Sequence, residues 1–196
     1  KDGAQVVMIN EEDHLRIQAV SKKLPLATLL EKAMLIDDAI EKNLEMAFDE
    51  KLGYLTACPT NVGTGLRASV MLHLPALVLT ENMDKVIRGL NQLGVAVRGI
   101  SGEGSEPTGS FFQISNQITL GLSEEKLLAK IDRLVKKICG FEINARKKLM
   151  RETPLVLIDK IERAQAVLRT CKLIGSNEAV GLLSTIRLAA DIGCME

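Results

Sequence analysis

Residues 58–70 read CPTNVGTGLRASV, a glycine-containing loop that runs into a short alternating segment. The first part, Cys58–Gly65, is rich in Pro, Thr, Asn and Gly, which favour turns over regular structure. The second part continues to residue 74 and alternates between apolar and other residues, which predicts a strand over 66–74 that Pro75 ends. The loop is not a P-loop, because that motif requires Gly-Lys followed by Ser or Thr. This stretch therefore predicts a strand that begins beside an arginine, Arg67.

Strands and helices alternate on both sides of this loop through the first ~120 residues. Hairpins and single helices separate the strands, which favours an α+β fold with a mostly antiparallel sheet flanked by helices over a doubly wound sheet. Charged residues stand beside glycine at several strand ends, so we expect one sheet to gather them at one edge. The expected strands lie at 5–10, 14–20, 66–74, 95–100 and 110–115, and the expected helices at 26–48 and 83–93.

After Gly121 the sequence predicts only helices. Ser123 begins a helix over 123–150 with two acidic residues in its first turn, where the positive end of the helix dipole favours them. Pro154 separates it from a helix that extends to about residue 174, and residues 175–177 begin another. The first ~120 residues are therefore expected to mix strands and helices, and the last ~75 to be all helix.

The composition excludes several classes of protein. The 196 residues carry 25 Lys and Arg and 25 Asp and Glu, and this neutral balance argues against a surface built to hold nucleic acid. Aromatic residues make up 3% of the chain, with no Trp, so base-stacking platforms are not expected and the core should be aliphatic. No apolar run of 18 residues is present, which argues against a membrane span. A chain that begins at Lys1 suggests a fragment of a longer protein.

The four cysteines form no C-x-x-C pair, so reduced thiols in the cytoplasm are the default expectation. Cys139, Cys171 and Cys194 have no chemical context in the sequence and are expected to be small core residues.

Two further segments carry charge beside a predicted strand. Three carboxylates, Glu11-Glu12-Asp13, occupy the turn between the first two strands, and Arg16 follows them. A solvated turn is the alternative interpretation. Arg98 and Gly99 end a strand and lead into the loop 101–109, SGEGSEPTG, which holds Glu103.

Four segments together resemble, in order and spacing, the catalytic half of the phosphagen (guanidino) kinase family, and the 58–70 stretch and GEGSE at 102–106 are most similar to its bacterial protein-arginine kinase branch. The resemblance runs from about Met8 to the end of the chain and is strongest between 52 and 122. It implies the glutamine-synthetase-like fold of the family over 1–145, as the C-terminal portion of the catalytic domain, and part of a helical C-terminal domain over 146–196. The four segments are 10–16, 58–68, 98–103 and 114–116.

The resemblance implies transfer of the γ-phosphoryl group of ATP, with Mg²⁺, to arginine side chains of proteins. Arginines hold the phosphates, since a guanidinium is a planar, permanently charged fork that grips phosphate oxygens. Each arginine could instead form a surface ion pair. The nucleotide-binding residues implied are Arg16, Arg67, Ala68, Ser69, Val70, Met71, Arg98, Gly99, Ile100, Ser101, Gly102 and Glu103.

The acceptor in this reaction is itself a guanidinium with a pKa above ~12, so a carboxylate must orient it and take a proton. The resemblance gives this role to Glu12 and Glu103, and it places Glu11 in the Mg²⁺ shell through water. Cys58 lies where the family keeps a reactive cysteine beside the substrate. His14 and His73 are expected to be structural, because the transfer requires no imidazole.

The helical extension resembles the C-terminal domain of the protein-arginine kinases. This resemblance implies protein substrates and a homodimer, with a heat-shock repressor and a Clp-type protease system as partners, and no direct contact with nucleic acid or membrane. A helical cap on the same core is the alternative interpretation of the extension, and the two can coexist. The alternatives are a small-molecule guanidino kinase, which the extension disfavours, and a non-catalytic binding or dimerisation module. The family's Ser-x-Arg-x-Arg segment does not occur in residues 1–9, and its Arg-Asp-x-x-Arg-Ala pocket is also absent. We therefore expect this polypeptide alone to be inactive or nearly so.

Overall fold

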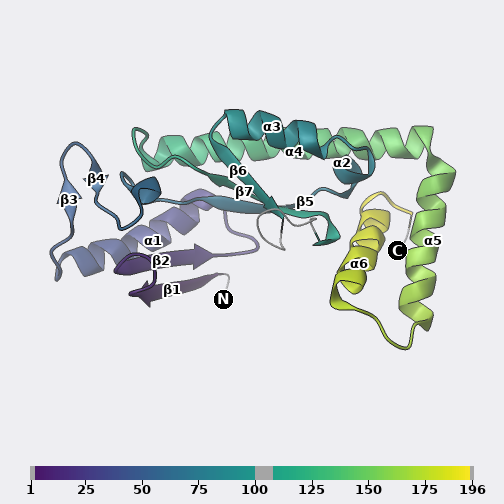
Figure 1. Cartoon of the computed structure of the whole chain (residues 1–196), viewed down its shortest axis with the longest axis horizontal. Coiled ribbons are helices and arrows are strands. Elements are labelled where there is room, and N and C mark those ends of the chain that lie inside the picture. Colours follow the sequence, from purple (N-terminus) through teal and green to yellow (C-terminus); the bar gives the residue numbers. More distant parts are fainter. Residues whose placement is uncertain (1–2, 100–107, 195–196) are drawn as a thin grey trace. The chain divides into compact units, whose positions relative to one another are not determined.

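The structure is a computed structural model that describes residues 3–99 and 108–194 (Figure 1). The chain divides into two compact units that are not continuous in sequence. The first unit runs to Ala68 and resumes over Asn116–Arg133, and the second comprises Ser69–Ser115 and the chain from Leu134 onward. Glu103 and its neighbours at 100–107 lie outside the described residues.

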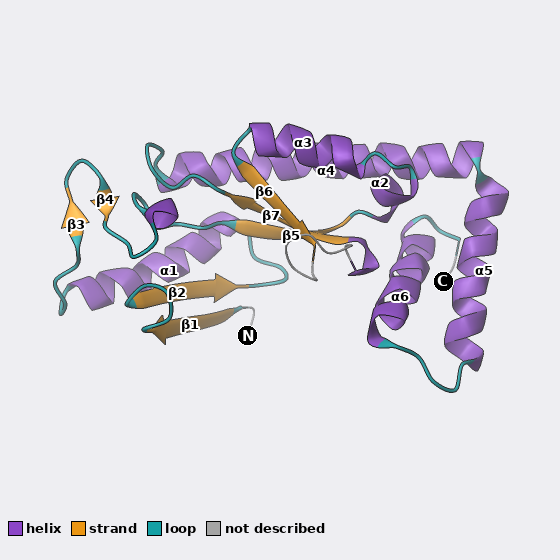
Figure 2. Cartoon of the chain, in the orientation of Figure 1, coloured by secondary structure: helices purple, strands orange, loops and turns teal. Residues whose placement is uncertain are grey.

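The first unit begins with an antiparallel hairpin, β1 (Ala4–Ile9) and β2 (Leu15–Val20), as expected from the alternating pattern (Figure 2). Its register sets Ile9 opposite Leu15, next to the turn. Helix α1 (Leu26–Glu41) follows and packs against β2.

Helix α1 ends at Glu41, so the prediction of a helix over 26–48 is wrong in its last part. Asn43 ends it: its backbone N–H donates to the Ile40 carbonyl at 2.9 Å and its side-chain amide donates to the Ala39 carbonyl at 2.9 Å. These bonds satisfy carbonyls that another helical turn would otherwise use. Of the apolar residues after Asn43, Phe48 belongs to a different element.

That element is a small hairpin, β3 (Phe48–Asp49) and β4 (Gly53–Tyr54), which the sequence did not predict. The rings of Phe48 and Tyr54 meet edge to face, with centroids 5.3 Å apart. The hairpin leads into a 3₁₀ turn, η1 (Pro59–Asn61), within the glycine-containing loop.

The second unit is built on a three-stranded sheet with the order β5-β7-β6. Strands β5 (Ser69–His73) and β7 (Phe111–Asn116) are antiparallel, and β6 (Val95–Gly99) lies on the other side of β7. Pro75 does more than end β5, because it begins the short helix α2 (Pro75–Leu79), where a proline at the first helical position loses no hydrogen bond.

The remaining helices are α3 (Met83–Gln92), which packs against β6, and α4 (Glu124–Glu152), α5 (Pro154–Thr170) and α6 (Ser176–Asp191). The sequence predicted all four of these helices. At the start of α4, the Ser123 hydroxyl accepts the Lys126 N–H at 3.4 Å. Helices α5 and α6 pack through buried Leu157, Ile161 and Leu188. Within the described ranges, no helix is both long and apolar enough to cross a membrane.

The core is aliphatic, as expected, with Val95, Ile114, Ile138 and Leu188 almost fully buried in the second unit. The expectation that one sheet gathers the charged strand ends is wrong. The described strands form three separate sheets, and β1 and β2 pair only with each other there. The acidic turn and Arg98 therefore belong to different sheets, because the short turn closes β1 and β2 into a hairpin of their own.

Candidate active site

The acidic turn between β1 and β2 holds an ion pair. Asn10 adopts a left-handed conformation, φ 54°, which asparagine tolerates, and its N–H donates to the His14 carbonyl at 3.0 Å. Arg16, at the start of β2, donates from Nη1 to Glu11 Oε2 at 2.7 Å. This hydrogen bond, aided by the Glu12 backbone N–H, lowers the pKa of Glu11 from its ordinary value. Both partners are exposed, so salt and competing anions weaken the pair.

Asp13 connects the acidic turn to the loop that contains Cys58. Its Oδ1 accepts the Ala57 N–H at 2.6 Å, and its Oδ2 accepts from the Asn61 amide at 3.4 Å. Sequence reasoning counted Asp13 only as one of three carboxylates, and its long-range role carries no local signal. Glu12, between Glu11 and Asp13, is exposed.

Cys58 is half-buried at the start of the η1 turn. Its Sγ lies 3.0 Å from Thr60 Oγ1, and its carbonyl accepts the Thr56 hydroxyl at 2.6 Å. The Thr60 hydroxyl therefore contacts the thiol of Cys58, and the Thr56 hydroxyl binds the backbone carbonyl of Cys58.

Arg67 is exposed, and the backbone on each side of it is fixed by a single buried side chain, Asn116. Asn116 Oδ1 accepts the Ala68 N–H at 2.8 Å, and its Nδ2 donates to the Leu66 carbonyl at 2.9 Å. Arg67 Nη2 also lies 3.4 Å from Asn61 Oδ1. Asn116 is the last residue of the segment 114–116 quoted from the sequence, but sequence reasoning gave it no role in the site.

The glycine-containing loop is also held by β4. Tyr54 and Gly63 exchange backbone hydrogen bonds of 2.8 and 3.2 Å. The Tyr54 hydroxyl donates to Asp37 Oδ2 of α1 at 3.0 Å, and burial together with this carboxylate raises the pKa of Tyr54 to about 12. The loop is therefore tied to α1 through a neutral phenol.

The remaining described nucleotide candidates lie in the sheet of the second unit. Ser69, Val70 and Met71 are on β5, with Ser69 opposite Ser115 of β7. Arg98 and Gly99 are the last two residues of β6, and the Arg98 side chain is exposed. Ile100, Ser101, Gly102 and Glu103 lie outside the described residues.

The structure brings several of the predicted residues together in the first unit. Glu11 and Arg16 form the ion pair, and Asp13 joins their turn to the loop of Cys58 and Arg67. This arrangement offers exposed carboxylates for a cation and exposed guanidinium groups for an anion. Among residues 3–99 and 108–194, no three His, Cys, Asp or Glu side chains are grouped as metal ligands.

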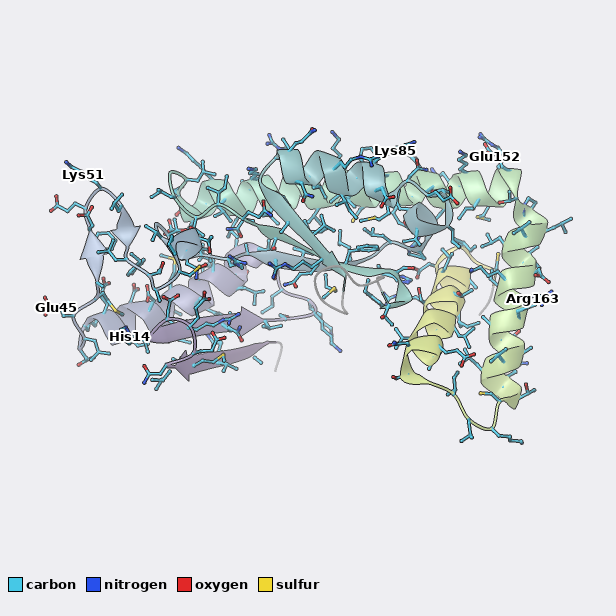
Figure 3. The ribbon with its side chains drawn as sticks, in the orientation of Figure 1. His14, Glu45, Lys51, Lys85, Glu152 and Arg163 are labelled. Atoms are coloured by element: carbon cyan, nitrogen blue, oxygen red, sulfur yellow. The ribbon has the colours of Figure 1, made fainter. Side chains whose placement is uncertain are left out.

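The two histidines differ in environment. His14 is exposed at the end of the acidic turn (Figure 3). His73, at the end of β5, lies with Nε2 2.7 Å from Ser184 Oγ of α6 and with its ring 4.7 Å from that of Phe111. Burial, with Arg187 and Arg146 nearby, lowers the pKa of His73 to about 4, so the ring is neutral at pH 7.

Two of the three remaining cysteines are not core residues, contrary to expectation. Cys139 is half-buried on α4, where burial raises the pKa of its thiol. Cys171 and Cys194 are exposed, because each follows the last residues of a helix, α5 or α6, rather than lying on its packed face.

Comparison with family models defines the class of protein. Residues 1–145 match the model described as ATP:guanido phosphotransferase, C-terminal catalytic domain. Residues 154–196 match the model described as Protein-arginine kinase McsB C-terminal domain. The chain belongs to the ATP:guanido phosphotransferase family.

Its curated relatives include protein-arginine kinases. The chain is 54% identical over 187 residues to that of Geobacillus stearothermophilus, covering 95% of this chain and 52% of the relative. It is 50% identical over 193 residues to that of Symbiobacterium thermophilum, covering 98% of this chain and 55% of the relative. The chain thus spans about half the length of these relatives.

Solved structures agree on the fold. Lombricine kinase superposes with a TM-score of 0.59 at 31% identity, over 70% of this chain and 38% of the other. A duplicated taurocyamine kinase from Schistosoma mansoni, with transition state analog components bound, superposes with a TM-score of 0.60. It is 27% identical to this chain, and the match covers 81% of this chain and 23% of the kinase. The expected α+β fold with antiparallel sheets and trailing helices is confirmed.

Proposed function

We propose that the chain is the latter part of a protein-arginine kinase, which transfers the γ-phosphoryl group of ATP to arginine side chains of proteins. The two family models, over 1–145 and 154–196, support this assignment and a division into a catalytic part, 1–145, and a helical part, 146–196. The observation that carries it is the pair of hydrogen bonds from Ala57 and Asn61 to Asp13. These bonds hold the turn of Glu11 and Glu12 next to the loop that leads to Arg67, and phosphorylation of a guanidinium needs carboxylates at the acceptor and cations at the phosphates.

Arg16, Arg67 and Arg98 bind the phosphates in this proposal, and the backbone of 67–71 and 98–103 lines the nucleotide. Phosphoryl transfer depends mainly on positioning and on neutralising the oxygens of the transferred group. Arg16 shares its guanidinium with Glu11 at an exposed site, so a polyphosphate can compete for it.

Glu12 and Glu103 orient the acceptor guanidinium and take its proton. The acceptor nitrogen forms a bond to the γ-phosphorus while the bond from that phosphorus to the β-γ bridging oxygen breaks. The proton released from the nitrogen passes to a carboxylate, and ADP leaves with the bridging oxygen. The exposure of Glu12 at the turn is compatible with access by a large substrate.

Mg²⁺ would supply charge neutralisation at the phosphates. We place Glu11 in the water shell of this ion, because it is an exposed carboxylate next to Arg16, one of the proposed phosphate ligands.

Cys58 lies beside the acceptor in this proposal, with its thiol held by Thr60 at 3.0 Å. The helical part supports a homodimer and contacts with substrate proteins, with a heat-shock repressor and a Clp-type protease system as expected partners in the cytoplasm. The polypeptide of 196 residues alone is expected to be inactive or nearly so.

The acceptor is tested with the full-length enzyme that contains this sequence. We expect phosphoarginine on a basic test protein and much slower phosphorylation of free arginine, both measured by mass spectrometry. Faster phosphorylation of free arginine would instead support a small-molecule guanidino kinase.

ATP titration of the 196-residue chain tests the third alternative, a non-catalytic module. Weak binding that improves in the full-length enzyme supports the proposal. Tight ATP binding by the full-length enzyme without any phosphoarginine would support a binding module.

A further inference from the structure

Thr119, three residues after Asn116, is 3% exposed and contacts the loop that joins Cys58 to Arg67. Its Oγ1 lies 3.0 Å from the Thr60 carbonyl oxygen and 2.7 Å from that of Val62, so two carbonyls share its hydroxyl proton. All of these residues belong to the first unit.

The backbone of Thr119 holds the same loop from a second point. Its carbonyl oxygen accepts the Thr64 N–H at 3.1 Å and lies 3.2 Å from the Thr64 hydroxyl. One residue therefore bonds to positions 60, 62 and 64 along a loop that forms no regular ladder of its own.

The fit around Gly63 shows how closely the loop is packed. Gly63 has φ 113°, and a Cβ at this position would lie 2.5 Å from the Thr119 carbonyl oxygen. On the other side, a Cβ on Gly53 would overlap the Gly63 carbonyl. The loop is thus confined between β4 and Thr119 and has little room to shift as a unit.

The two ends of this loop carry chemistry that the proposed function uses. Thr60, whose carbonyl Thr119 holds, also contacts the Cys58 thiol through its hydroxyl. Beyond Thr64, the Leu66 N–H bonds to the Thr64 hydroxyl at 3.2 Å, and Arg67 follows directly. Loss of the Thr119 hydroxyl leaves two carbonyls without this donor, which favours displacement of the loop.

We propose that Thr119 is a positioning residue whose hydroxyl, through Thr60, sets the place of the Cys58 thiol. The role of this thiol in catalysis rests on the proposed function, but its dependence on Thr119 does not.

The matched pair Thr119→Val and Thr119→Ser tests this. Valine keeps the branched shape without the hydroxyl, whereas serine keeps the hydroxyl. In the 196-residue chain, iodoacetamide labelling is followed at each cysteine by mass spectrometry, with exposed Cys171 and Cys194 as internal references. We expect T119V to change the labelling rate of Cys58 by about fivefold or more, and T119S to remain within about twofold of the unchanged chain.

Equal Cys58 labelling in T119V and T119S would overturn the proposal, as would a change of the same size at the reference cysteines. If T119V does not fold, as judged by circular dichroism, T119A replaces it and must show the same contrast with T119S. In the full-length enzyme, T119V should lower kcat, and T119S should keep it close to that of the unchanged enzyme. Absence of kinase activity in the unchanged enzyme would count against the proposed function alone.

Discussion

The three consecutive carboxylates of the acidic turn have three different environments. Glu11 is bound by Arg16, Asp13 accepts two hydrogen bonds from the Cys58 loop, and Glu12 between them is exposed. A turn that fixes its two outer carboxylates holds the backbone of the middle one, so Glu12 presents a carboxylate from an ordered position. This suits a group that meets a cationic acceptor.

Replacing Glu12 by Gln should remove proton transfer and leave the fold unchanged. In the full-length enzyme we expect kcat to fall by about 100-fold or more, with a thermal midpoint close to that of the unchanged protein. Glu45→Gln, at an exposed loop position, is the matched control and should keep its activity (Figure 3). Wild-type turnover in E12Q would show that Glu12 has no part in the reaction.

Asp13 should contribute to stability through the loop it holds. Asp13→Ala leaves the Ala57 N–H without its partner at 2.6 Å, and we expect the free energy of unfolding in urea to fall by about 1–2 kcal/mol. Asp13→Asn keeps an acceptor oxygen and should lose less. Equal losses in the two variants would mean that the hydrogen bond to Ala57 contributes little.

At the scale of elements, buried polar side chains join helix to helix. Glu142 of α4 is 4% exposed and accepts the Ala76 and Leu77 N–H groups at the start of α2, at 3.1 and 2.9 Å. Arg146 donates to Glu142 at 2.8 Å and to Asp191 of α6 at 3.1 Å. Because an unpaired buried charge is strongly destabilising, this network favours one arrangement of α2, α4 and α6 within the second unit.

His73 should make stability depend on pH. Its folded pKa of about 4 lies below the ordinary 6.5, so the unfolded chain binds more protons between these values and stability falls as pH decreases through this window. Arg187 and Arg146 facing the ring strengthen the effect, and Asp191 opposes it. Unfolding in urea at pH 5 and pH 7 measures the difference.

His73→Gln should reduce that pH dependence, even if it lowers stability at both pH values. His14→Gln, at an exposed turn, should keep the dependence of the unchanged protein. The same slope in H73Q and H14Q would mean that other groups cause it.

The elements that the sequence predicted well are those with a strong period of their own, such as β1, β2 and α4 to α6. The end of α1 was missed because the apolar spacing continues past Glu41 while Asn43 bonds back to the helix. The division of the strands into three sheets depends on which strands pair with one another. The apolar period within a strand carries no information about its partner. In the site, Arg16 and Cys58 stood out by motif, whereas Asp13 and Thr119 act across 44 or more positions.

At the scale of the whole molecule, a chain with zero formal charge carries local charges of both signs. In our proposal the acidic turn meets the cationic acceptor, and the arginines of the loop and of β6 meet the polyphosphate. The chain spans about half the length of its protein-arginine kinase relatives, so the activity belongs to the longer enzyme in our proposal.

The most direct test of the central claim is detection of phosphoarginine in a basic protein treated with Mg²⁺-ATP and the full-length enzyme, with E12Q treated in parallel. Mass spectrometry should locate phosphate on arginine side chains with the unchanged enzyme and at least about 100-fold less with E12Q. Phosphate found only on serine or threonine, or none on arginine despite ATP binding, would contradict the account.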